Sequence, residues 1–235
     1  FAFGSILAGS ADELAEPLPE SHTAPLPSEH DTANFDWSEI DNHDGGPEPL
    51  GVMRRAIADR MAMSKRHIPC FYVTGVVNMQ NCLTLRQELK KNKQKATFND
   101  MSIKASALAL RDNPRAAAVY TPQGLYSRSR LHIGFPAALP DDGLVVPVIK
   151  DADKKPLAEI AAETRALAEK AKRGDLTPYD CSGGVFSVSY LGSYEVENFI
   201  AIVNPGEASI LAMGKVRDEV VALDGQVKIL PRANM

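Results

Sequence analysis

Apolar residues recur every three or four positions in four stretches of the chain, and this spacing predicts four helices. The predicted helices cover 54–63, the region of 82–89, 101–111 and 156–173. Asn99-Asp100 are expected to cap the third helix, because short polar side chains accept hydrogen bonds from the first free backbone N–H groups. Gly174 is expected to end the fourth, because glycine adopts the left-handed conformation common after a helix.

Runs rich in β-branched and aromatic residues predict strands between and after these helices. The predicted strands are 71–77, 131–139, 144–149, 185–190, 210–216, 219–223 and 227–230. Strands alternate with helices at first and cluster towards the end. This order indicates an α/β domain in which helices pack against a mixed sheet.

Charge divides the chain. Phe1 to Leu50 contains eleven acidic residues, six prolines and no Lys or Arg. Such a segment buries too little apolar surface to offset its ordering entropy, so residues 1–50 are predicted to form an acidic, Pro-rich, disordered arm. The remaining 51–235 carry 26 basic and 19 acidic residues, a net charge of +7, and are predicted to form the folded core domain.

Aromatic residues interrupt the polar arm at two places: Phe1 and Phe3, and Phe35 and Trp37. Aromatic side chains among acidic ones suit docking on a basic surface, which could belong to this protein's own domain. The alternative is an inert, solvated linker. Docking and linker are weighed equally for the first pair, and docking is favoured for the second.

Composition excludes several classes of protein. No run approaches the eighteen apolar residues that a membrane helix needs, and we expect neither a membrane nor a nucleic-acid partner. Cys70, Cys82 and Cys181 are an odd number without paired short spacing, which argues against a disulfide framework or a zinc site. We expect them to be small buried apolar side chains. Because the first residue is not Met, we expect a fragment or processed product.

Five stretches, in order, resemble the catalytic core of the dihydrolipoamide acyltransferases of 2-oxo acid dehydrogenase complexes. They are 54–69, 99–105, 142–152, 183–192 and 201–214. The resemblance runs from about Leu50 to the last residue. It implies a two-layer fold similar to chloramphenicol acetyltransferase, in which a mixed sheet packs with helices, and a trimer. It also implies a channel between subunits that coenzyme A and the lipoyl-lysine arm enter from opposite ends.

The family transfers an acyl group between thiols. A histidine base takes the proton of the attacking thiol, because an unperturbed thiol is largely protonated near neutral pH. A serine hydroxyl stabilises the oxyanion of the tetrahedral intermediate, and the resemblance places this serine at Ser189. From the residues alone, Ser189 reads as a locally satisfied serine at the end of a strand.

The family's histidine belongs to an Asp-His-Arg motif, which is absent from this chain. His67 and His132 lie in the predicted domain, but neither matches the position of the base, and we expect surface or structural roles for both. Cys70 stands where the family usually has His, Tyr190 where it has a small or amide residue, and Gly134-Phe135-Pro136 interrupts a predicted strand. These departures suggest relaxed demands on the channel.

Two functions therefore compete. The favoured one is a catalytically inactive, core-forming subunit of the pyruvate dehydrogenase complex, like the dihydrolipoamide dehydrogenase-binding protein (protein X). The alternative is an active dihydrolipoamide acyltransferase whose histidine segment is missing from this chain. A different acyltransferase of the same fold ranks last, because it needs a base elsewhere.

Expected partners and cofactors depend on the favoured function. We expect a homotrimer that joins a dihydrolipoamide acetyltransferase core and anchors dihydrolipoamide dehydrogenase through segments before residue 1. No cofactor is required, and coenzyme A and the lipoyl group are expected only if the domain is active. The favoured function implies the mitochondrial matrix, and the alternative implies the bacterial cytoplasm in a prokaryote.

Overall fold

The computed structural model describes residues 48–139 and 143–235. The chain divides into two units, Phe1–Pro49 and Leu50–Met235, and the second contains nearly all of the described residues. The arm predicted over residues 1–50 lies outside the described residues apart from its last three. The same holds for its four candidate docking residues, Phe1, Phe3, Phe35 and Trp37.

The four amphipathic stretches form helices, as the spacing of apolar residues predicts. These are α1 (Val52–His67), α2 (Gln80–Lys91), α3 (Phe98–Asp112) and α4 (Leu157–Arg173). Two short 3₁₀ helices, η3 (Pro114–Ala117) and η4 (Gly192–Tyr194), follow α3 and the strand β8 (Phe186–Tyr190), respectively. Gly174 ends α4 with a φ of 75°, in the left-handed region that glycine adopts without steric cost.

The predicted cap of α3 was wrong by two residues. Thr97, not Asn99, is the cap: its hydroxyl accepts a hydrogen bond from the Asp100 N–H, and Asp100 Oδ2 accepts one from the Thr97 N–H at 2.7 Å. This reciprocal pair is a capping box. Asp100 is buried and also accepts a hydrogen bond from Thr164 of α4 at 2.6 Å, so one carboxylate both starts α3 and joins it to α4.

A four-stranded mixed sheet lies at the centre of the domain, in the order β7-β4-β8-β9. Its strands are β4 (Ile133–Gly134), β7 (Val148–Ile149), β8 (Phe186–Tyr190) and β9 (Ser209–Met213). β8 runs parallel to β4 and β9, whereas β7 is antiparallel to β4. The mixed sheet packed with helices confirms the predicted fold class.

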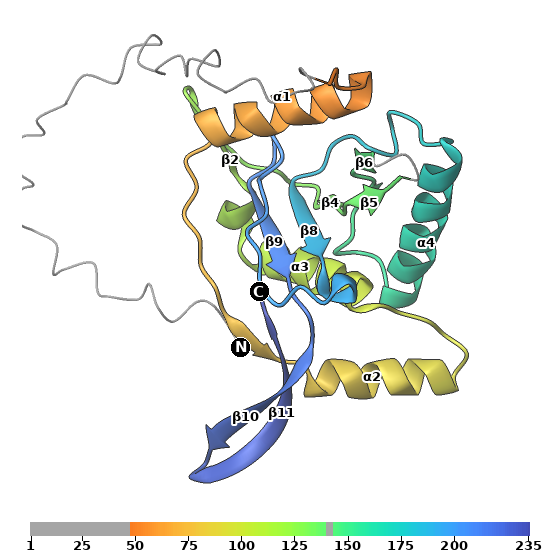
Figure 1. Ribbon diagram of the computed structural model, residues 1–235, viewed down its shortest axis with the longest axis vertical. Coiled ribbons are helices and arrows are strands. Elements are labelled where there is room, and N and C mark those ends of the chain that lie inside the picture. The colour runs from red at the N-terminus through yellow and green to blue at the C-terminus, as the bar shows by residue number, and fades with distance from the viewer. Residues whose placement is uncertain (1–47, 140–142) are drawn as a thin grey trace, which may run out of the picture. The chain divides into compact units, whose positions relative to one another are not determined.

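Three smaller sheets surround it. One has the antiparallel order β1-β11-β10, and β2 with β3 and β5 with β6 form two-stranded pairs. Their bounds are β1 (Val76–Asn78), β2 (Val119–Thr121), β3 (Gly124–Tyr126), β5 (Ala137–Ala138), β6 (Leu144–Val145), β10 (Arg217–Leu223) and β11 (Gln226–Asn234). In Figure 1 the β10–β11 hairpin extends away from the central sheet, at the end opposite α1.

Several predicted strands were shorter than expected. Residues 71–75 form no strand, and the stretches 131–139 and 144–149 each form two strands of two residues. β4 ends at Gly134, and Pro136, which has no N–H for a sheet, follows it, so the predicted interruption is confirmed. The hairpin of β2 and β3 was missed because its strands have only three residues each.

The side chains of β8 alternate between the face of the sheet that packs on the core and the opposite face. Val188 is fully buried in a cluster with α3 and α4 residues such as Ile103 and Ile160. Because side chains on a strand alternate between faces, Ser187 and Ser189 point away from this cluster. The helices α3 and α4 therefore cover one face of the central sheet. Helix α1 lies across the end of the domain, near the opposite face of that sheet (Figure 1).

The expectation that the three cysteines are buried was wrong. Cys70 and Cys181 are exposed, and both lie in loops. Cys82, on α2, is half-buried and packs against the edge of an apolar cluster, and all three are free thiols. In the described ranges, no group of three or more His, Cys, Asp or Glu side chains is placed to hold a metal ion. Nor do the described helices include one long and apolar enough to cross a membrane.

Candidate active site

Ser189 lies in the wall of a cavity of about 890 Å³, which we call the Ser189 cavity. One side is formed by α1, through residues that include Met53, Ile57 and Arg60. The other side comes from β8, β9 and the loop before β9, and includes Ser187 and Glu207. Ser189 is 9% exposed, and its strand position directs it to this face of the sheet.

A buried hydrogen bond anchors helix α1 beside the cavity. Ser64 is its single fully buried residue among those described, and the Ser64 hydroxyl donates a 2.6 Å hydrogen bond to the Val203 carbonyl. Apolar side chains of α1 line the cavity, while most of the helix is solvent-exposed. The apolar stripe of α1 therefore faces an open space rather than a packed core.

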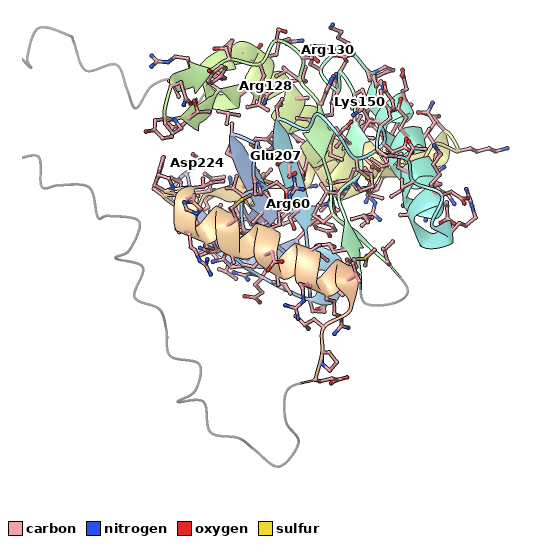
Figure 2. All side chains as sticks on the ribbon, turned by 90° about the horizontal axis from the view of Figure 1, so that it is seen from above. Arg60, Arg128, Arg130, Lys150, Glu207 and Asp224 are labelled. Carbon is pink, nitrogen blue, oxygen red and sulfur yellow. The ribbon has the colours of Figure 1, made fainter. Side chains whose placement is uncertain are left out.

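Glu207 is the carboxylate among the residues that line the Ser189 cavity. The Asn204 side-chain amide donates to Glu207 Oε1 at 3.2 Å, and the Ser187 hydroxyl also hydrogen-bonds to this carboxyl. Burial raises the pKa of Glu207, and these hydrogen bonds together with the positive charge of Arg60 oppose the rise. Figure 2 shows Glu207 on the sheet side and Arg60 on α1.

Neither histidine of the domain lines the Ser189 cavity. His67 is exposed near the end of α1, and His132 is half-buried, with Nδ1 accepting a 2.9 Å hydrogen bond from the Asp151 N–H. Burial lowers the pKa of His132, and this hydrogen bond suits the neutral imidazole. The surface or structural roles expected for these residues agree with these positions.

Positive charge gathers near one edge of the cavity. Arg128 lines it, and Lys150 donates to the Ser182 carbonyl beside Cys181, another lining residue. Arg130 forms a bidentate pair with Asp151, and the Arg130 hydrogen bond lowers the pKa of that carboxyl to about 2. Figure 2 shows Arg128, Arg130 and Lys150 together on the side of the domain away from α1.

A second cavity of about 640 Å³ lies at the other side of the same loop. It is lined by the last turn of α1, by Pro69, by β2 and by the loop that contains Glu207. Glu207 therefore belongs to the walls of both cavities.

Comparison with known proteins identifies the family. Residues 43–235 match the model of the 2-oxoacid dehydrogenases acyltransferase (catalytic domain) family. The chain belongs to this family. The dihydrolipoamide acyltransferase resemblance predicted from five sequence stretches is thereby confirmed.

Curated relatives of this acyltransferase-family chain come from plants, animals and bacteria. It is 38% identical over 183 residues to dihydrolipoyllysine-residue acetyltransferase component 3 of the pyruvate dehydrogenase complex of Arabidopsis thaliana, which covers 75% of the chain and 34% of that protein. It is 36% identical over 169 residues to the mouse pyruvate dehydrogenase protein X component, with 72% and 34% covered. The chain thus spans about a third of the length of these relatives.

Solved structures of the family have the same fold. A probable dihydrolipoamide acetyltransferase from Listeria monocytogenes superimposes with a TM-score of 0.77 at 30% identity, covering 82% of this chain and 84% of that one. The dihydrolipoamide acetyltransferase of Azotobacter vinelandii gives a TM-score of 0.77 at 28% identity, with 83% and 85% covered. The α/β core predicted from sequence is therefore the core of this acyltransferase family.

Sequence patterns located one cavity residue and missed its neighbours. Ser189 was predicted from the family motif, and the structure places it in the cavity wall. Ser187, Asn204 and Glu207 were not singled out, although they lie in stretches that resemble the family. The available signal was a Glu next to a turn of Asn, Pro and Gly, placed directly before an apolar strand.

Proposed function

We propose that this domain forms the multimeric core of a pyruvate dehydrogenase complex component. Family membership and relatives named as acetyltransferase and protein X components support the proposal. The observation that carries it is an apolar surface on the β10–β11 hairpin, which a single copy leaves exposed to water. We further propose that three copies associate around a three-fold axis and bury this surface.

The apolar surface is one face of the hairpin. Val220 pairs with Ile229 and Ala222 pairs with Val227, and directly opposed residues share a face. Val220 is 72% exposed, Val227 77% and Ile229 68%. An exposed hairpin with a continuous apolar face is typical of a surface that another subunit covers.

The segment between α1 and β1 also exposes apolar side chains. Phe71 is 88% exposed and Val73 67% exposed, and the segment is joined to the end of β11 by hydrogen bonds between Gly75 and Met235. Exposed apolar side chains therefore occur on both the β10–β11 hairpin and the segment that leads into β1, at opposite edges of the β1-β11-β10 sheet. This arrangement favours association of copies over a monomer.

Sedimentation velocity of the protein tests assembly directly. A trimer, or a larger particle built from trimers, is expected at micromolar concentration. A monomer that persists at tens of micromolar would overturn the proposal.

The two versions of this function differ in catalysis. In the active version, the Ser189 cavity takes part in acetyl transfer between lipoyl-lysine and coenzyme A. There the Ser189 hydroxyl would donate a hydrogen bond to the oxyanion, and the basic residues near Arg128 suit phosphate groups such as those of coenzyme A. In the version like protein X, the same cavity is retained without turnover and no cofactor is required.

An acetyl-transfer assay from acetyl coenzyme A to dihydrolipoamide, performed on the intact natural protein, separates the two versions. Turnover that falls about 100-fold or more in Ser189→Ala is expected of an acyltransferase, in line with loss of an oxyanion donor. Absence of turnover from a folded multimer supports the inactive assembly subunit. Turnover unchanged in Ser189→Ala would remove Ser189 from the mechanism.

Two partner proteins belong to the proposed function. We propose that the domain joins a dihydrolipoamide acetyltransferase core and that the longer protein anchors dihydrolipoamide dehydrogenase through segments before residue 1. Deletion of Phe1–Trp37 is expected to leave the domain folded but to weaken co-sedimentation with the acetyltransferase core, and unchanged co-sedimentation would contradict docking by the arm.

The proposed compartment is the mitochondrial matrix, with the bacterial cytoplasm as alternative, since both mitochondrial and bacterial relatives occur.

A further inference from the structure

The Glu207 carboxyl occupies a space that two glycines leave open. A Cβ at Gly184 would lie 3.0 Å from Glu207 Oε1, and one at Gly134 would lie 2.7 Å from the Ser187 hydroxyl. Neither glycine has a positive φ, so conformational freedom does not require glycine there. The absence of side chains at both positions makes room for the carboxyl and for the serine that holds it.

The two oxygens of this carboxyl are in different situations. Oε1 accepts the hydrogen bond of Asn204, whereas Oε2 is buried and has no hydrogen-bond partner among the described residues. Glu207 as a whole is 8% exposed. Leaving a buried carboxylate oxygen unpaired costs free energy, so a donor that reaches it stabilises the site.

The position of Glu207 indicates where such a donor would come from. The residue forms part of the Ser189 cavity wall, and it is the carboxylate among the residues that line this cavity. Because Asn204 occupies Oε1, Oε2 is the oxygen left for a donor that enters this cavity. The remainder of the lining is largely apolar, with Arg60 and Arg128 as its cationic groups.

We infer that Glu207 recognises the amide of the thiol-bearing chain that enters the Ser189 cavity, by accepting a hydrogen bond from its N–H. This inference rests on the proposed function, in which the ligand is a dihydrolipoyl group in amide linkage. An apolar cavity accepts a hydrocarbon chain of any type, and a buried carboxylate acceptor adds preference for a chain with an N–H donor. Glu207 thereby fixes the depth at which the thiol meets Ser189.

Two ligands of almost equal size isolate this contact. Dihydrolipoamide carries an amide N–H, whereas the methyl ester of dihydrolipoic acid carries the same thiols and carbonyl and has no N–H donor. Their dissociation constants are measured by calorimetry under reducing conditions for the wild-type protein, Glu207→Gln and Ser187→Ala. Glu207→Gln is nearly isosteric and retains an acceptor for Asn204, but it presents an NH₂ group where Oε2 stood.

We expect wild type to bind the amide about tenfold or more tightly than the ester, as for a hydrogen bond to a charged acceptor. In Glu207→Gln the ratio falls towards one, mainly through weaker binding of the amide. Ser187→Ala removes a partner of the carboxyl but retains the acceptor, so the ratio is expected to stay within about twofold of wild type. Thermal unfolding confirms that both variants are folded.

The other outcomes overturn the inference in distinguishable ways. An unchanged ratio in Glu207→Gln excludes Glu207 as the acceptor, while the proposed function stands. An equal loss for amide and ester shows that Glu207 acts through Arg60 or the shape of the cavity, and also overturns the inference. Failure of wild type to bind either ligand removes both the inference and the proposed acyl-transfer cavity.

Discussion

The apolar face of the β10–β11 hairpin offers the sharpest test of assembly. We consider the double substitution V220K and I229E. These two residues are direct cross-strand partners, so the new side chains can form an ion pair that preserves the hairpin while placing charge on its apolar face. Both positions are exposed in the single domain, and the fold is therefore expected to lose little stability.

The expected magnitude is set by the exposed fractions. Complete burial of a Val or Ile side chain is worth about 1.5–3 kcal/mol. The exposures of Val220, Val227 and Ile229, at 72%, 77% and 68%, give roughly 3–6 kcal/mol per hairpin if a neighbouring copy covers the face. Two of these three residues become charged in the double variant. The dissociation constant of the assembly should therefore rise by about 100-fold or more.

Sedimentation velocity over a concentration series measures this shift. Wild type is expected to remain assembled over a range in which the double variant dissociates into monomers with unchanged circular dichroism. Lys228→Gln serves as the control, because Lys228 lies on the opposite face of the same hairpin. The reasoning is refuted if the double variant stays folded and assembles as tightly as wild type.

Three further outcomes are expected within the domain. Asp100→Ala should lower the free energy of unfolding by about 2–4 kcal/mol, measured by urea denaturation, because it removes half of the α3 capping box and the charged acceptor of the Thr164 hydroxyl, which keeps only the Ala161 carbonyl at 3.2 Å; a loss below about 1 kcal/mol would contradict this role. Arg130→Gln should return the pKa of Asp151 from about 2 towards 3.8, measured by NMR titration, and an unmoved pKa would exclude Arg130 as the cause. The pKa of His132 is lowered in the folded state, so its contribution to stability is present above pH 6.5 and is lost as pH falls through the folded pKa. The variant His132→Gln should therefore lose less thermal stability than wild type between about pH 7.5 and about pH 5. An unchanged slope of melting temperature against pH would refute the assignment.

Local patterns predicted the elements whose signals lie within one segment. The apolar stripe of α4 and Gly174 at its end gave that helix nearly to the residue, because a helix depends on neighbours three and four positions away. The N-cap of α3 was predicted two residues too late because Thr97, Asn99 and Asp100 are all suitable capping residues. Thr97 is the cap because its hydroxyl meets the buried carboxylate and the N–H of Asp100. The short strands escaped prediction because two or three residues carry too little pattern.

The residues of the candidate site also differ in whether the sequence predicted them. The family motif placed Ser189, and alternation along a strand puts Ser187 on the same face. Glu207 is separated from these serines by some twenty residues of chain, and its burial depends on the gap left by Gly134 and Gly184 on other segments. A pattern of residue types does not report such a gap, because it arises from the packing of three segments.

The sequence by itself determined the family, the α/β class, the four helices and the acidic character of the first fifty residues, since composition, periodicity and motif order are properties of the chain alone. The tertiary structure decided which side chains share the cavity beneath α1, which oxygen of Glu207 lacks a partner among the described residues, and that the apolar face of the β10–β11 hairpin is left uncovered. These features depend on distances between residues far apart in sequence. These distances are set by the packing of helices against strands in the core around Val188.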